Sequence, residues 1–66
     1  MKYQIGDILK VESNKTNGYA YCIITEYRDQ DTANVFWIIE NGNIKNDPMY
    51  RSWSFSILDS EFEKVS

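Results

Sequence analysis

The chain has no histidine and only one cysteine and one proline in its 66 residues. Without histidine it lacks the side chain that most often acts as a general base near neutral pH. Cys22 has no second cysteine for an intrachain disulfide, and no Cys/His cluster is present to bind zinc. Three separated glycines do not form a phosphate-binding loop. These absences predict a protein that is not an enzyme and that holds no metal or other cofactor.

Positive charge is also scarce, because seven Lys and Arg stand against ten Asp and Glu, for a net charge of −3. A duplex-DNA binder neutralises phosphates with basic side chains, so this balance disfavours duplex DNA as a partner. No apolar run approaches the roughly 20 residues of a membrane-spanning helix, so we expect no membrane association. With a lone cysteine and no signal peptide, the expected location is the reducing cytoplasm.

Two groups that could carry chemistry have simpler interpretations. Asp29 and Asp31 have the spacing of calcium ligands, but no following Gly and distal Glu complete a calcium loop. We interpret both as solvated turn residues. Cys22 lies within a predicted strand without a His partner. We interpret it as a small buried hydrophobic residue rather than as a nucleophile.

Aromatic residues are abundant instead, with five Tyr, three Phe and two Trp. The length allows a single domain, residues 1–66, with a modest core in which each large ring buries about 150–250 Å². Turn signals separate five short apolar segments, a pattern typical of an all-β sandwich or barrel. We predict strands near residues 8–12, 19–27, 33–40, 51–56 and 63–65, a hairpin turn at Asn41-Gly42 with Gly42 at positive φ, and one 3-10 turn at residues 57–60.

Alternation of side chains assigns the faces of these strands. In residues 51–56, Trp53 and Phe55 alternate with serines, which predicts a buried aromatic side and a solvated serine side. We expect Trp53 and Trp37 to be largely buried. The two middle strands carry apolar residues on both faces. These faces are Val35, Trp37 and Ile39 against Phe36 and Ile38, and Tyr19, Tyr21, Ile23 and Tyr27 against Ala20, Cys22 and Ile24.

Two neighbouring strands that are apolar on both faces have more apolar surface than so small a barrel can bury. One interpretation is that loops of a highly curved barrel cover the second face. The other is that the surplus surface binds a partner, and we predict that Tyr19, Tyr21, Phe36 and Ile38 form it. A bulge between Tyr21 and Tyr27 would change which tyrosines face outward.

Several segments of the chain recur together in one class of small barrel. They are residues 6–11 with their Gly-Asp start, residues 21–27 with their Glu-aromatic end, residues 35–37 before Asn41-Gly42, and then Trp53 and Leu58. This set resembles SH3-like barrels of the Tudor/KOW type, in particular minibarrel proteins of tailed bacteriophages. The resemblance implies a single five-stranded SH3-like barrel with a short 3-10 turn before the last strand. The chain lacks the Lys-Gly-Asp segment of KOW domains and the Ala-Leu-Tyr-Asp-Tyr segment of proline-binding SH3 domains. The resemblance therefore does not identify a ligand.

We therefore expect a non-enzymatic protein-interaction module of the cytoplasm, either a phage accessory protein that binds a host protein or a small virion component. Homodimerisation through the same four side chains is an alternative. A second alternative is a single-stranded nucleic-acid-binding minibarrel, in which exposed rings stack on bases close to basic residues. The basic residues would be Lys10, Lys15, Lys45 and Arg51.

Overall fold

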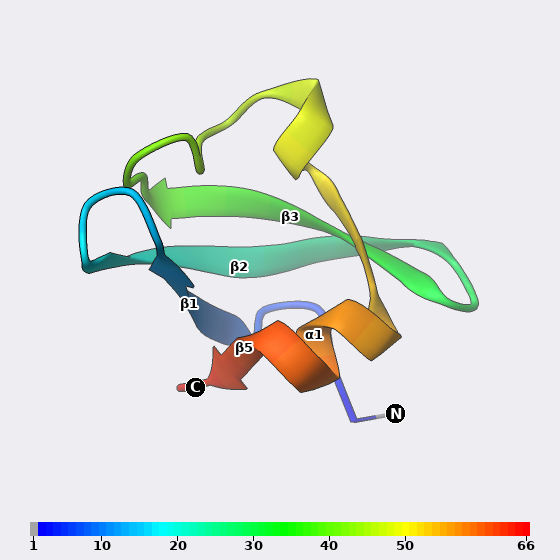
Figure 1. Ribbon diagram of the computed structural model, residues 1–66. Coiled ribbons are helices and arrows are strands. Elements are labelled where there is room, and N and C mark those ends of the chain that lie inside the picture. The colour runs from blue at the N-terminus through cyan, green and yellow to red at the C-terminus, as the bar shows by residue number, and fades with distance from the viewer. Residues whose placement is uncertain (1) are drawn as a thin grey trace.

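A computed structural model describes residues 2–66, which form one curled antiparallel sheet of five strands (Figure 1). The order across the sheet is β4-β3-β2-β1-β5. Between the outermost strands β4 and β5 the sheet stays open, so the fold is a half-barrel rather than a closed barrel. The strands are β1 (Ile8–Ser13), β2 (Gly18–Asp29), β3 (Thr32–Ile39), β4 (Ser52–Ser54) and β5 (Phe62–Lys64).

The all-β prediction is confirmed, and each predicted strand is present within a few residues of its expected bounds. The closed barrel is the part of the prediction that is wrong. Short edge strands explain the opening, because β4 and β5 each have three residues and each pairs on one side only, β4 with β3 and β5 with β1. A helix joins them across the open side (Figure 1).

The helical turn before the last strand is longer than predicted. An α-helix, α1 (Phe55–Glu61), replaces both the expected 3-10 turn at residues 57–60 and the end of the expected fourth strand. Ser54 causes this change, because its side chain accepts a hydrogen bond from the Ile57 N–H at 3.3 Å and thereby caps the helix. Within residues 2–66 the 3-10 turn lies earlier, at η1 (Pro48–Tyr50), where Asp47 accepts from the Met49 N–H at 3.0 Å.

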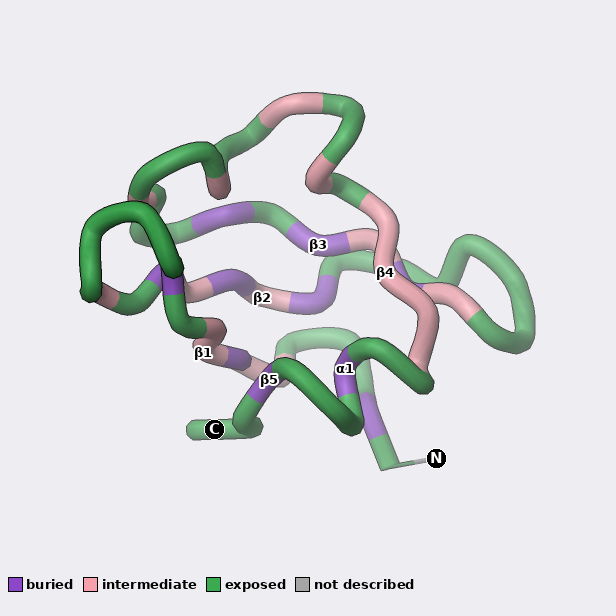
Figure 2. The backbone as a smooth tube through the Cα atoms, viewed as in Figure 1, coloured by how far each residue is buried: buried purple, intermediate pink, exposed green. Residues whose placement is uncertain are grey.

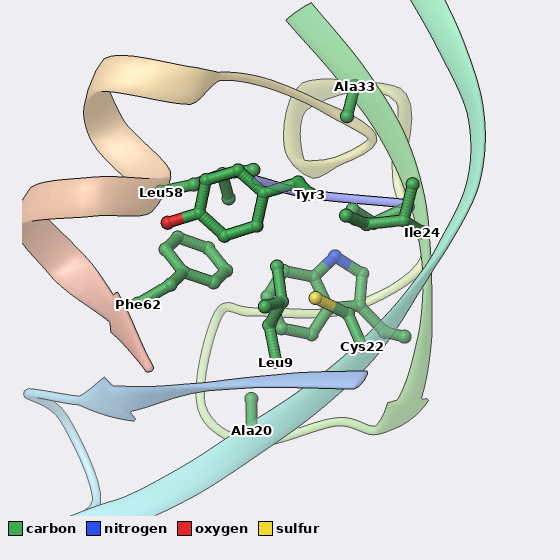
Figure 3. Close-up of a cluster of buried hydrophobic side chains, with 10 residues drawn as sticks. Tyr3, Leu9, Ala20, Cys22, Ile24, Ala33, Leu58 and Phe62 are labelled. Carbon is green, nitrogen blue, oxygen red and sulfur yellow. The ribbon is translucent and has the colours of Figure 1, made fainter. Parts of the chain in front are cut away.

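The core lies on the concave face of the sheet. Leu58 from α1 and Phe62 from β5 meet side chains of β1 and β2 there (Figure 3). Along β2 and β3, buried positions alternate with more exposed ones (Figure 2). The buried hydrophobic residues are Tyr3, Leu9, Ala20, Cys22, Ile24, Ala33, Val35, Trp37, Leu58 and Phe62.

The two tryptophans have unequal burial. Trp37 is only 2% exposed, as predicted, whereas Trp53 is half-buried because it lies on β4 beside the open side of the half-barrel. Both indole N–H groups donate to the Tyr50 carbonyl, at 2.7 Å from Trp37 and 2.9 Å from Trp53. The serines of this strand are not simply solvated, because Ser52 donates to Asn34 at 2.5 Å and Ser54 caps α1.

Gly42 has a φ of +63°, so the predicted left-handed position is confirmed. Reciprocal backbone hydrogen bonds of 3.0 Å between Asn41 and Ile44 close the tight turn. The turn does not lead into a paired strand, which corrects the hairpin prediction. Instead the Asn46 side chain takes the place of a strand partner, accepting from the Trp37 N–H at 2.7 Å and donating to the Trp37 carbonyl at 2.9 Å.

Candidate functional site

The strand register shows where the four predicted binding residues lie. Residues that pair directly across an antiparallel sheet project from the same face. Tyr21 pairs with Lys10 of β1, and Tyr19 pairs with Glu12 of the same strand. On the other side of β2, Ile23 pairs with Phe36 of β3. All of these positions alternate with buried residues, so they lie on the outer, convex face of the sheet.

A bulge in β3 adds two isoleucines to this face. Tyr21 pairs with Ile39 and Cys22 pairs with Trp37, which leaves Ile38 as an extra residue. Ile38 is 50% exposed and Ile39 is 51% exposed. The expectation that Ile39 shares the face of Trp37 is therefore wrong, because the extra residue shifts the alternation by one.

A second irregularity, in β2, moves Tyr27 away from the outer face, although its side chain remains 37% exposed. Ile24 pairs with Val35 and Glu26 pairs with Asn34, so Thr25 is the extra residue there. Tyr27 then pairs with the fully buried Ala33, and its hydroxyl donates to the Tyr3 carbonyl at 2.7 Å. Its ring packs edge-on against Phe55, with ring centroids 6.2 Å apart. The anticipated effect of a bulge is thus seen at Tyr27, whereas Tyr19 and Tyr21 keep their outward positions.

The outer face carries a contiguous apolar surface, which we call the outer-face patch. Phe36 is 55% exposed and Tyr19 is 49% exposed, while Tyr21 and Ile23 are half-buried. Loops therefore do not bury the two most exposed rings. Two residues of this surface are not among the four predicted from the sequence: Ile23, which shares the tyrosine face, and Ile39, whose orientation depends on the bulge. The patch consists of Tyr19, Tyr21, Ile23, Phe36, Ile38 and Ile39.

Charged side chains border the patch along β1 and β5. Lys10 lies with its Nζ 4.9 Å from the centre of the Tyr19 ring and forms a 3.2 Å ion pair with Glu63. The hydrogen bond to Glu63 raises the pKa of the Lys10 ammonium group. Glu12, beside Tyr19, makes no ion pair within residues 2–66. Glu26 lies on the same face and accepts from the Asn34 side chain at 2.9 Å.

The other basic residues considered for nucleic-acid binding are not on the strands of this face. Lys15 lies in the loop after β1, and Lys45 lies in the connection after β3. Arg51 precedes β4 at the far edge of the sheet. Of these four basic residues, Lys10 is the one that lies within a strand on the outer face, and its charge is already paired with Glu63.

The remaining candidates for chemistry have structural roles in the part of the chain described. Cys22 is fully buried, and burial raises the pKa of its thiol to about 12, so it stays protonated at neutral pH. Asp31 is an exposed turn residue, as interpreted, whereas Asp29 is the exposed last residue of β2 and accepts from the Asp31 N–H at 2.8 Å. Residues 2–66 contain no cluster of three His, Cys, Asp or Glu residues that could hold a metal ion, and no surface pocket. Neither of the helices described is long and apolar enough to cross a membrane.

Comparison of the chain with known protein families, with curated proteins and with solved structures finds no match.

Proposed function

We propose that this chain is an SH3-like interaction module that binds another protein through the outer-face patch. The supporting observation is the exposure of Phe36, Ile38 and Ile39, each at least half accessible, side by side on one face of a 66-residue chain. Contiguous apolar surface of this kind marks sites of interaction in small proteins. Aromatic side chains such as Tyr19 and Tyr21 suit such a site because the ring packs while the hydroxyl remains hydrated or bonds to the partner.

The SH3-like assignment rests on the sequence resemblance and agrees with two features of the fold. β1 lies between β2 and β5, and a helical turn precedes the last strand. The departure is the open side between β4 and β5. If the chain is phage-encoded, as the resemblance implies, the partner would be a host protein or a component of the virion.

A protein partner is favoured over single-stranded nucleic acid by the charges around the patch. Single-strand binders combine stacking rings with a positively charged groove that follows the backbone. On the strands that carry the patch, the ammonium group of Lys10 is paired with Glu63, and the other basic residue of β2, Arg28, lies at the opposite end of the strand from Tyr19. Two further carboxylates, those of Glu12 and Glu26, lie on the same face. A phosphate backbone that covers Tyr19 and Tyr21 would meet the carboxylates of Glu12 and Glu63, with Lys10 as the cation beside them.

The proposal is tested by affinity capture with matched variants. Phe36→Ala and Tyr21→Ala each remove a ring from the patch, while Met49→Ala removes the 76%-exposed Met49 in η1, outside the patch. The proposal expects the unmodified chain and Met49→Ala to capture the same partner in equal amount. The two patch variants should lose it, because a central buried ring carries much of the binding free energy at an interface. Equal recovery by all four proteins would show that the patch is not the binding surface.

The alternatives are separated by two further measurements on the same proteins. Sedimentation at several concentrations reports self-association, and a concentration-dependent dimer abolished by Phe36→Ala would assign the patch to a second copy. Titration with single-stranded oligonucleotides at low salt tests the nucleic-acid alternative. Binding that is lost in Phe36→Ala would favour it over a protein partner.

A further inference from the structure

We infer that the occupant of the outer-face patch is a segment of another protein in which apolar side chains are bordered by Lys or Arg. This inference rests on the proposed function and specifies the chemistry of the partner. It follows from how apolar and charged residues are distributed over the rows of the outer face.

The apolar part of the outer face covers β3 and β2 and reaches the start of β1 at Ile8. One row across the strands joins Phe36, Ile23 and Ile8, and all three are apolar. The next row begins with Ile39 and Tyr21. None of the close aromatic pairs within residues 2–66 includes Phe36 or Tyr21, and Phe36 is 55% exposed, so its ring is accessible to a partner. An occupant must present apolar side chains to this half of the patch.

The charged part of the outer face covers β1 and β5. The row of Tyr21 continues through Lys10 to Glu63, and the row of Tyr19 ends at Glu12. Lys10 and Glu63 neutralise each other at 3.2 Å. Glu12 has no ion pair within residues 2–66 and lies directly beside Tyr19. An occupant that covers Tyr19 meets the Lys10 ammonium group, which lies 4.9 Å from the ring centre and is already paired with Glu63. It also meets the Glu12 carboxylate, with which a cationic side chain of the occupant can pair.

The same charges act against a second copy as the occupant. Face-to-face pairing of two copies would use the same surface on each. Each copy has a net charge of −3 and brings the same surplus of outer-face carboxylates, so like charges would approach one another. A basic partner segment gains from this charge, because opposite potentials steer association and fix the register of the complex.

The test uses two synthetic heptapeptides with blocked ends, in which Leu alternates with Lys in one and with Glu in the other. Each is titrated into the isotopically labelled chain, and backbone amide shifts are followed by NMR. We expect the Lys peptide to shift the amides of Tyr21, Phe36 and Ile38 and the Glu peptide to leave them in place. Glu12→Gln should weaken binding of the Lys peptide about two- to fivefold, as expected for loss of one exposed charge pair.

Glu61→Gln is the matched control, because Glu61 is exposed on α1, outside the strands of the outer face. It should leave the affinity unchanged. The inference is overturned if the Lys peptide does not bind, if its shifts spread over other acidic surfaces, or if Glu12→Gln has no effect. Equal binding of both peptides at the patch, with loss of binding in Phe36→Ala, would refute the basic partner while leaving the proposed protein-binding function intact.

Discussion

Phe36 and Trp37 are neighbours in β3, yet they lie in opposite environments. Trp37 is 2% exposed, and its ring centroid lies 6.2 Å from that of Trp53 and 6.1 Å from that of Phe62. Phe36 is 55% exposed and takes part in none of the close aromatic pairs within residues 2–66. The inner face is covered by α1, β5 and the N-terminal segment, whereas Phe36, Ile38 and Ile39 on the outer face each stay at least half exposed. A hydrophobic residue of a strand therefore stabilises the fold when other side chains pack against it, and its hydrophobicity alone does not decide this.

The largest expected difference in the free energy of unfolding is between the variants that lack one or the other of these two rings. Trp37→Ala should lower the free energy of unfolding by about 3–5 kcal/mol, through lost burial and the cavity left behind. A domain of this size has only about 3–10 kcal/mol in total, so the variant will be largely unfolded in mild urea. Phe36→Ala should cost about 1 kcal/mol or less, because the ring is already half solvated. Urea denaturation followed by circular dichroism measures both.

Trp37→Phe replaces Trp37→Ala in this measurement if Trp37→Ala does not fold at all. It keeps most of the buried volume but loses the hydrogen bond from the indole N–H to the Tyr50 carbonyl. It should therefore remain folded with reduced stability. Equal stability of Trp37→Phe and the unmodified chain, together with a costly Phe36→Ala, would reverse the assignment of the two faces.

Ile24 and Ile39 compare the same residue type on the two faces. Ile24 is 1% exposed and Ile39 is 51% exposed. Ile24→Ala should cost about 2–5 kcal/mol, whereas Ile39→Ala should cost about 1 kcal/mol or less. Because simple alternation places Ile39 with Trp37, similar losses in the two variants would show that the bulge at Ile38 is not present.

Gly42 and Gly18 compare two glycines at one end of the half-barrel. Gly42 has a φ of +63°, and an added Cβ would lie 2.5 Å from the hydroxyl oxygen of the buried Ser13. Gly18 does not have a positive φ, and an added Cβ would press on the Asn41 side chain, whose Nδ2 donates to the Tyr19 carbonyl at 3.4 Å. Gly42→Val should therefore lower the free energy of unfolding by about 1–3 kcal/mol and by more than Gly18→Val. Thermal melts of both variants check the ranking, and the reverse order would mean that the chain turns elsewhere.

The smallest expected effect concerns the N-terminal segment that covers one end of the inner face. Asp59 accepts from Lys2 at 2.8 Å and from the Tyr3 hydroxyl at 2.7 Å, and these bonds hold the pKa of its carboxyl below the usual range. A carboxyl with a lowered pKa stabilises the fold above its unfolded pKa of about 3.9. That stabilisation is lost as pH falls through the lower, folded pKa.

Acid titration of stability tests this contact. Between pH 7 and pH 2 the unmodified chain should lose more stability than Asp59→Asn, which lacks the titrating carboxyl. Glu61→Gln, on the same helix, should behave like the unmodified chain, because Glu61 makes no ion pair within residues 2–66. Parallel acid profiles for Asp59→Asn and the unmodified chain would show that Asp59 does not hold the N-terminal segment.

Local patterns in the sequence were sufficient to predict much of the sheet. Asn41-Gly42 predicted the left-handed turn, because few residues other than glycine adopt that φ. Alternation placed Trp37 and Cys22 inside and Phe36 outside, since successive side chains of a strand point to opposite faces. These predictions succeed because each depends on a few adjacent residues.

The failures arise where distant contacts decide the local structure. The orientations of Ile39 and Tyr27 depend on bulges, which adjust the curl of the whole sheet and have no residue signature here. α1 is seven residues long, too short for a helical apolar stripe, and it relies on the Ser54 cap and the insertion of Leu58 into the core. Alternation correctly predicted that Tyr19 and Phe36 are exposed. Ile23 was left out of the predicted site although alternation places it on the same face, and Ile39 was missed because of the bulge.

The most direct test of the division between the two faces is the reactivity of one thiol on each. Cys22 is fully buried on the inner face, with the pKa of its thiol raised to about 12. A second chain carries Cys22→Ala together with Phe36→Cys and so has its only thiol on the outer face. With a chromogenic disulfide reagent at pH 8, we expect rapid labelling of the Phe36→Cys chain and labelling of Cys22 only as fast as the protein unfolds. Comparable rates for the two thiols in the folded state would contradict it.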